Sequence, residues 1–215
     1  MFNLDKFYSE YQTDPQHITI NGKAFQFLVP QSIDRFINPD DPMQNFPLWA
    51  KIWPAGTILA GYMDHLPIQP KRRILEIGAG IGLVGVVAAA AGHNITITDI
   101  NPHALAFARA NAAINGCRDV PVRLLDWFEL QLTGRYDMIV GSEVIYKEED
   151  IDHLIGLFKH YLKPDGTIIL VEEMRKTLSA FFKQTEPVYT LKIHKMRLRS
   201  DQESIQILRI EMRPH

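Results

Sequence analysis

The segment LEIGAGIGLVG, residues 75–85, joins an apolar run to a cluster of small residues that could hold a ligand against the backbone. Two glycine spacings overlap in it, Gly78-x-Gly80-x-Gly82 and Gly80-x-Gly82-x-x-Gly85. Glycine permits a tight reversal and a close approach of a ligand, and a helix that follows presents free N–H groups at its start. Both spacings indicate a nucleotide-like ligand, and the glycines alone do not choose between S-adenosylmethionine and a dinucleotide.

An acidic residue, Glu76, precedes these glycines in a run otherwise made of Ile and Leu. An ionised carboxylate repels a phosphate, whereas it is favourable beside the cationic amino group of a methionine moiety. Glu76 therefore favours S-adenosylmethionine over a nicotinamide or flavin dinucleotide. The alternative is a structural acid that accepts hydrogen bonds from nearby N–H groups.

Further acids follow two later apolar runs. Asp99 ends NITITD, and Asp126 with Trp127 follows VPVRLL. A carboxylate at the position of Asp99 can accept both hydroxyls of a ribose, which serves either class of ligand. The alternatives are an N-cap of the next helix for Asp99, where Asn101 competes, and core packing for Trp127.

The elements that position these residues become regular from residue 72 onwards. Apolar runs alternate with helical segments, which predicts a Rossmann-like α/β fold whose mostly parallel sheet is covered on both faces. We expect strands at 72–78, 94–99, 120–125, 135–142 and 167–173, and helices at 83–92, 102–116 and 148–166. Residues 190–199 and 204–213, joined by the link 200–203, predict an antiparallel hairpin at the sheet edge.

The first 47 residues have a different pattern. Residues 18–20 and 25–27 alternate around Asn21-Gly22, which is typical of a β-hairpin. A loop is expected at 37–47, and a helix follows Pro54.

The arrangement and the motif together resemble the class I S-adenosylmethionine-dependent methyltransferases. The motif E-x-G-x-G-x-G, here Glu76, Gly78, Gly80 and Gly82, resembles the first motif of that family. The resemblance covers residues 48–215 and implies a seven-stranded sheet with the last strand antiparallel beside the fifth, preceded by an extension at 1–47. It also implies that Asp126 bonds the adenine amino group, with Trp127 packed near the ring.

Two further stretches indicate a branch of this family. The sequence Glu143-Val144-Ile145-Tyr146 resembles the Asp/Glu-x-x-Tyr/Phe motif of the seven-strand protein lysine methyltransferases, and PLWAKIWPAG resembles their tryptophan-bearing segment. The resemblance implies methyl transfer from S-adenosylmethionine to a protein lysine. A small amine acceptor, as in nicotinamide N-methyltransferase-like proteins, and a catalytically silent binding protein are the alternatives.

Each candidate catalytic residue then has an expected role. Glu143 binds the incoming ammonium, Tyr146 orients the acceptor, and Trp53 forms a wall of the donor or acceptor pocket, because aromatic faces attract cations. The alternatives are a helix cap for Glu143, core packing for Tyr146, and a staple between the N-terminal segment and the sheet for Trp53.

Composition narrows the remaining classes. The net charge of −2 favours neither nucleic acid nor an acidic membrane. The single cysteine, Cys117, rules out an internal disulfide, and residues 1–10 lack the apolar core of a secretory signal, so we expect a cytoplasmic protein. The longest apolar run, 82–92, is too short for a membrane span, and the eight histidines show no metal-ligand spacing. The sequence leaves the oligomeric state open.

Overall fold

A computed structural model of the protein describes residues 2–40, 46–199 and 204–215. Its main sheet has the strand order β5-β4-β3-β6-β7-β9-β8, in which the first five strands are parallel and β9 lies antiparallel between β7 and β8. The strands are β3 (Arg73–Ile77), β4 (Asn94–Asp99), β5 (Val122–Leu124), β6 (Tyr136–Ser142), β7 (Leu162–Glu173), β8 (Tyr189–Arg199) and β9 (Ser204–Pro214). This confirms the predicted seven-stranded sheet, with the last strand beside the fifth parallel strand.

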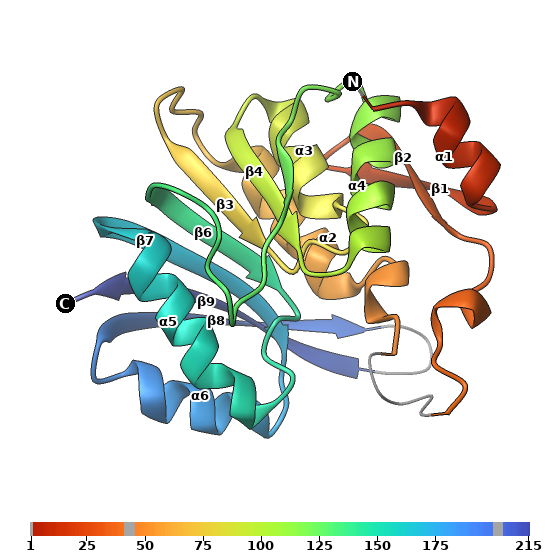
Figure 1. Ribbon diagram of the computed structural model, residues 1–215. Helices are drawn as coiled ribbons and strands as arrows, with labels where there is room; N and C mark the ends of the chain where they lie inside the picture. Colours follow the sequence, from red (N-terminus) through yellow and green to blue (C-terminus); the bar gives the residue numbers. More distant parts are fainter. Residues whose placement is uncertain (1, 41–45, 200–203) are drawn as a thin grey trace.

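Helices cover both faces of this sheet (Figure 1). On one face lie α2 (Pro54–His65), α3 (Leu83–Ala91) and α4 (Pro102–Ile114), and on the other lie α5 (Ile151–Tyr161) and α6 (Thr177–Thr185). Successive residues of β3 alternate between the two apolar layers, with Ile74 in the first and Leu75 and Ile77 in the second. Within the described ranges, no helix is long and apolar enough to cross a bilayer.

The N-terminal extension forms α1 (Leu4–Glu10) and a separate two-stranded sheet of β1 (Thr13–Ile20) and β2 (Lys23–Pro30). Its turn confirms the predicted hairpin, because Asn21 (φ 48°) and Gly22 (φ 81°) both adopt the left-handed conformation that a tight two-residue turn requires. The domain boundary between residues 47 and 48 stays a prediction.

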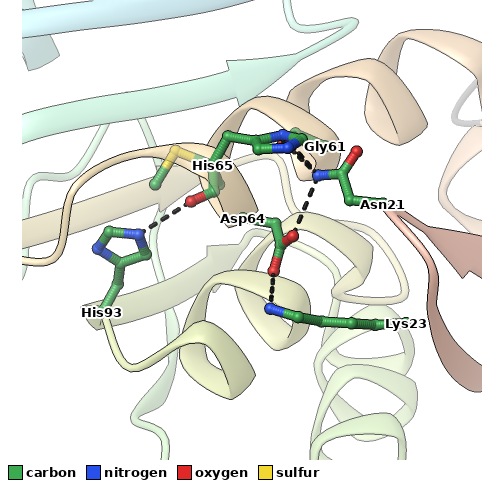
Figure 2. A network of polar contacts seen from close by, with 7 residues as sticks. Asn21, Lys23, Gly61, Asp64, His65 and His93 are labelled. Carbon is green, nitrogen blue, oxygen red and sulfur yellow. Dashed lines mark hydrogen bonds and ion pairs between the residues drawn. The ribbon is translucent and has the colours of Figure 1, made fainter.

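Polar contacts tie the hairpin turn to the C-terminal end of α2 (Figure 2). The Asn21 side-chain amide donates to the carbonyl of Gly61 at 2.9 Å and to the carboxylate of Asp64 at 3.0 Å. Lys23 Nζ lies 2.7 Å from the other oxygen of Asp64. The hairpin therefore docks on α2 through specific hydrogen bonds as well as through apolar packing.

A buried amide connects the same hairpin to the glycine-rich turn. The Asn111 side chain, on α4, accepts from Leu28 N at 2.7 Å and donates to Leu28 O at 3.1 Å. It also donates to Ile81 O at 2.9 Å. Because Ile81 belongs to the segment 75–85, the extension helps to fix the turn that forms the candidate site.

Some element bounds differ from the sequence predictions. The helix expected at 148–166 ends at Tyr161, and β7 begins at Leu162, because Pro164 cannot occupy a helix interior and restricts Lys163 to extended geometry. The third strand is shorter than expected, and no prediction covered α1 or α6. The described residues also form three short 3₁₀ helices: η1 (Asp34–Phe36), η2 (Leu48–Ala50) and η3 (Glu148–Asp150). Part of the predicted loop at 37–47, and the link 200–203, lie outside the described residues.

Candidate active site

A cavity of about 300 Å³ lies at the carboxyl ends of β3, β4 and β6, beside the segment that follows β5. The segment from Leu48 to Gly56, which contains η2 and the start of α2, lines another wall. Eight of the ten predicted site residues line it: Trp53, Gly78, Gly80, Asp99, Asp126, Trp127, Glu143 and Tyr146. Glu76 and Gly82 do not line it. The cavity lies where open α/β sheets bind their ligands.

The glycine-rich turn packs too closely against neighbouring residues to admit side chains at two positions that line the cavity. Gly78 (φ 58°) and Gly80 (φ 55°) are both left-handed, and a Cβ at Gly80 would lie 3.1 Å from the carbonyl oxygen of Trp49. A Cβ at Gly78 would lie 2.9 Å from the Val144 side chain. The left-handed backbone and the close packing against Trp49 and Val144 therefore require glycine at both positions, and both glycines line the cavity.

Gly82 does not line the cavity, and its role is in helix packing. It is the left-handed N-cap of α3, and a Cβ there would lie 2.9 Å from the Cβ of Ala108 on α4. The small residue lets the two helices meet closely behind the turn. Its predicted place in the ligand motif therefore corresponds, in this structure, to helix packing beside the cavity.

Asp99 is held in place by backbone donors. One carboxylate oxygen accepts from Gly80 N and the other from Asn101 N, both at 2.8 Å. Asn101 caps α4, because its side chain accepts from His103 N at 2.8 Å, so Asp99 is left free of that role. A carboxylate offers about four lone-pair sites, which leaves acceptor capacity on the cavity side for two ribose hydroxyls. Burial raises the pKa of Asp99, although both backbone bonds oppose that change.

The residues after β5 form the other end of the cavity. Asp126 is half-buried and accepts from Phe128 N at 2.8 Å. Trp127 packs against the second apolar layer and also lines the cavity, so core packing and a ligand contact are compatible for it. A flat aromatic side chain beside a carboxylate acceptor suits a purine ring with an exocyclic amino group.

Glu76 lies away from the cavity. The residue is 2% exposed, and its carboxyl group packs so close to Gly85 that a side chain there would collide with it. One carboxyl oxygen, Oε2, has no hydrogen-bond partner among the described residues. Burial, and then the charge of Asp99, raise the pKa of Glu76 well above its ordinary value. This placement matches the alternative of a structural acid, and contact with a methionine moiety stays a prediction.

Glu143 follows the end of β6 and adopts a left-handed backbone, φ 53°, which residues with a Cβ rarely do. Its side chain is 6% exposed. One carboxylate oxygen accepts from Glu173 N at 2.7 Å, and the other pairs with Arg175. The side chain does not cap η3 or α5. Strained non-glycine residues of this kind cluster at functional sites.

Aromatic side chains flank Glu143 and the opposite wall. Tyr146 is 40% exposed, so it is not a core residue, and its ring centroid lies 5.1 Å from the Arg175 guanidinium carbon. On the other wall, Trp53 donates to the Leu48 carbonyl at 2.7 Å, and Lys51 Nζ lies 3.6 Å from the centroid of its ring. A cation of the protein itself lies over each of these two rings, so both rings can make cation–π contacts.

Two neighbours of Glu143 were not predicted. Glu172, on β7, is fully buried, accepts from Val144 N at 2.8 Å and has a second oxygen without a partner among the described residues. Burial raises the pKa of Glu172 to about 8. An acid in the apolar run TIILVEE was a visible signal for Glu172, whereas no pattern pointed to Arg175.

Comparisons with known proteins agree with this geometry. A family described as lysine methyltransferase matches residues 42–188. Protein N-lysine methyltransferase METTL21A of Danio rerio is 37% identical over 129 residues, which cover 56% of this chain and 59% of that protein. EEF1A lysine methyltransferase 3 of Mus musculus is 34% identical over 146 residues, which cover 64% and 62%. Histone-arginine methyltransferase METTL23 of Homo sapiens is 32% identical over 112 residues, which cover 49% and 59%.

These matches span about three fifths of the relatives' own length. The crystal structure of ribosomal protein L11 methylase from Lactobacillus delbrueckii subsp. bulgaricus superposes with a TM-score of 0.55 at 21% identity, and covers 75% of this chain and 77% of that one. That similarity shows the fold alone. Because the family match takes in more than half of its residues, the chain belongs to the lysine methyltransferase family and has the fold of the class I methyltransferases.

Proposed function

We propose that this protein transfers a methyl group from S-adenosylmethionine to the side-chain amine of a lysine in another protein. One observation carries the proposal. The cavity that is built from the glycine-rich turn and Asp99 also contains Glu143 and Tyr146, so a donor site and a cation-binding acid share one space. The names of the lysine methyltransferase relatives support the same acceptor class.

The donor end of the cavity supplies position and polarity. Asp99 would accept the ribose hydroxyls, the backbone of Gly78 and Gly80 would lie against the chain of the ligand, and Asp126 with Trp127 would receive the adenine. When bound, the sulfonium compound supplies an electrophilic methyl group. The protein then contributes chiefly by holding the two reactants in line.

The acceptor end must bind a cation and then allow it to lose a proton. A lysine amine has a pKa of about 10.4 in water and arrives as an ammonium. The Glu143 carboxylate would bind that ammonium, and Tyr146 would contact its methylene chain. Burial raises the pKa of the Tyr146 hydroxyl, with the nearby Glu143 charge adding to the effect, so Tyr146 stays protonated and is not a base. Burial of the amine among apolar walls lowers its pKa, and the proton passes to water.

The protein partner and the compartment belong to the same proposal. Tyr146 is the most exposed of the predicted site residues and lies near Glu143. A lysine on a folded or extended protein segment would have to pass Tyr146 to reach the cavity. A single, partly buried cysteine, Cys117, suits a reducing compartment such as the cytoplasm.

The experiment is incubation of the purified protein with a cell lysate and methyl-labelled S-adenosylmethionine, followed by mass spectrometry of the products. We expect label on lysine of one or a few proteins, and loss of that label with Glu143→Gln, which is matched in size. Label on arginine, or only in the small-molecule fraction, would contradict the lysine assignment.

Calorimetry separates the remaining alternatives. We expect S-adenosylhomocysteine to bind both wild-type protein and Glu143→Gln, and NAD to bind neither. Binding without any transfer would identify a silent binding protein, and binding of NAD in place of S-adenosylhomocysteine would identify a dinucleotide enzyme.

A further inference from the structure

A second group of charged residues lies behind Glu143. We call Glu143, Glu172 and Arg175, with the ring of Tyr146, the arginine–glutamate cluster. Glu143 and Glu172 are both buried, and burial raises the pKa of each. The charge of Glu143 also raises the pKa of Glu172, whereas the charge of Arg175 opposes the rise at Glu143. Arg175 is the only cation in the described part of the chain that forms an ion pair with Glu143.

The position of Arg175 is fixed by anchors on both sides. It lies in the short link between β7 and α6. One residue before it, Met174 N donates to Gln206 O on β9 at 2.8 Å. Two residues after it, the Thr177 hydroxyl donates to the carbonyl of Ile145 at 3.2 Å. Because Ile145 belongs to the motif that contains Glu143 and Tyr146, this hydrogen bond fixes the position of the link relative to the motif.

The guanidinium contacts both predicted acceptor residues at once. It pairs with Glu143, and its central carbon lies 5.1 Å from the Tyr146 ring centroid. The guanidinium group is planar and permanently charged, so it can fix the direction of a carboxylate and the place of a ring together. The Glu143 carboxylate keeps acceptor capacity for an ammonium, because Glu173 N and Arg175 use only two of about four lone-pair sites.

We propose that Arg175 is a positioning residue that keeps Glu143 ionised and directed toward the acceptor amine. This inference rests on the proposed function and adds a residue to it. Other charged or titratable groups around Glu143 are Glu172 and Glu173 from β7, Tyr146 from its own loop, and Asp99, Asp150 and Lys51 in the cavity wall. Most of these are acids, so without Arg175 the Glu143 carboxyl group would be buried among like charges, which favours its protonated form.

Two variants test this role. Arg175→Met removes the charge and keeps the bulk, and Arg175→Lys keeps the charge. Carbon-13 NMR of the glutamate carboxyl groups from pH 4 to 9, with Glu143→Gln to assign the signal, measures the titration of Glu143 directly. Loss of a charge partner at contact distance shifts a carboxyl pKa by about 1–3 units. We therefore expect Glu143 to titrate at least about one unit higher in Arg175→Met, and close to wild type in Arg175→Lys.

Methylation of lysate proteins at several pH values gives the second readout. We expect the acidic limb of the pH profile to move to higher pH in Arg175→Met and to return to its wild-type position in Arg175→Lys. The affinity for S-adenosylhomocysteine should stay within about twofold of wild type in both variants. That is well below the tenfold change that a shift of about one pKa unit represents. If Arg175→Met does not fold, Arg175→Gln replaces it.

The outcomes separate the inference from the proposed function. An unchanged Glu143 titration in the folded Arg175 variant would overturn the inference, even if wild-type protein methylates lysine. A shifted titration with no transfer by wild type would leave the role of Arg175 in place and refute the proposed function. Stronger methylation by Arg175→Met than by wild type at neutral pH would also overturn the inference, because Arg175 would then block the acceptor site.

Discussion

Two helical glycines allow one substitution to be tested in opposite settings. Gly85, in α3, lies against the buried carboxyl group of Glu76 and the side chain of Ile97, both of which a Cβ would meet at impossible distances. Gly156, in α5, is exposed and has no atom within 4 Å of the position of a Cβ. Replacement of glycine by alanine in a helix stabilises it by about 1 kcal/mol where there is room.

The structure therefore sets the sign and the size of each effect. For Gly156→Ala we expect a gain of about 0.5–1 kcal/mol in the free energy of unfolding. For Gly85→Ala the same gain is outweighed, because the new Cβ would overlap two buried side chains and overpacking costs about 1–3 kcal/mol. The net expectation for Gly85→Ala is a loss of about 1–2 kcal/mol.

Urea denaturation and thermal melts provide the assay. For a chain of this length, 1 kcal/mol shifts the midpoint by about 2–4 °C, so the two variants should melt on opposite sides of wild type. The double variant Gly85→Ala with Glu76→Ala should recover part of the lost stability, since one of the two colliding groups is removed. A Gly85→Ala protein as stable as wild type would refute this description of the space beneath α3.

Three other predictions follow from the same contacts. Glu76→Gln should change the affinity for S-adenosylhomocysteine, measured by calorimetry, by less than about threefold, because Glu76 does not line the cavity. A loss of more than about tenfold, the equivalent of 1.4 kcal/mol, would instead support the predicted contact between Glu76 and the ligand. Hydrogen bonds from Lys23 and then Asn21 lower the pKa of Asp64, so this stabilisation is present above the ordinary aspartate pKa and is lost as the pH falls through the lowered value. Asp64→Asn should therefore reduce the free energy of unfolding by about 0.5–1 kcal/mol at pH 7, a small effect because Lys23 is mostly exposed. At pH 3 the reduction should be smaller. An equal reduction at both pH values, measured by urea denaturation, would contradict the charge argument. The chain has three tryptophans, Trp49, Trp53 and Trp127, and all line the cavity, so S-adenosylhomocysteine should change the intrinsic fluorescence saturably; an unchanged emission would place the ligand elsewhere.

Most of the fold could be predicted from the sequence, because residues that start or stop helices stand at the ends of its apolar runs. Gly92 closes α3 as a left-handed C-cap, and Asn101-Pro102 begins α4, as expected. The helix α6 lacks such signals, since no side chain caps it and its first turn has no acid. The end of α5 was misjudged because amphipathic spacing continued toward Pro164, whereas strand pairing of Leu162 with Tyr136 begins earlier.

The sequence allowed the site residues to be predicted where their place after a strand determines their position in the fold. Asp99 ends β4, and Asp126 and Glu143 follow β5 and β6, so all three lie at the carboxyl edge of the parallel part of the sheet. The direction of a side chain was less accessible. Glu76 lies on the face of β3 that α3 covers, a consequence of strand alternation and of the space at Gly85. The partner of Glu143 comes from 32 residues later in the chain, a contact that no local pattern encodes.

The most direct test of the central claim is a crystal structure of the protein with S-adenosylhomocysteine and a peptide that contains the methylated lysine. We expect the ribose hydroxyls on Asp99, the adenine between Asp126 and Trp127, and the lysine nitrogen within hydrogen-bond distance of the Glu143 carboxylate, facing the sulfur. A ligand bound outside this cavity, or a lysine nitrogen that lies away from Glu143 and Tyr146, would contradict the account.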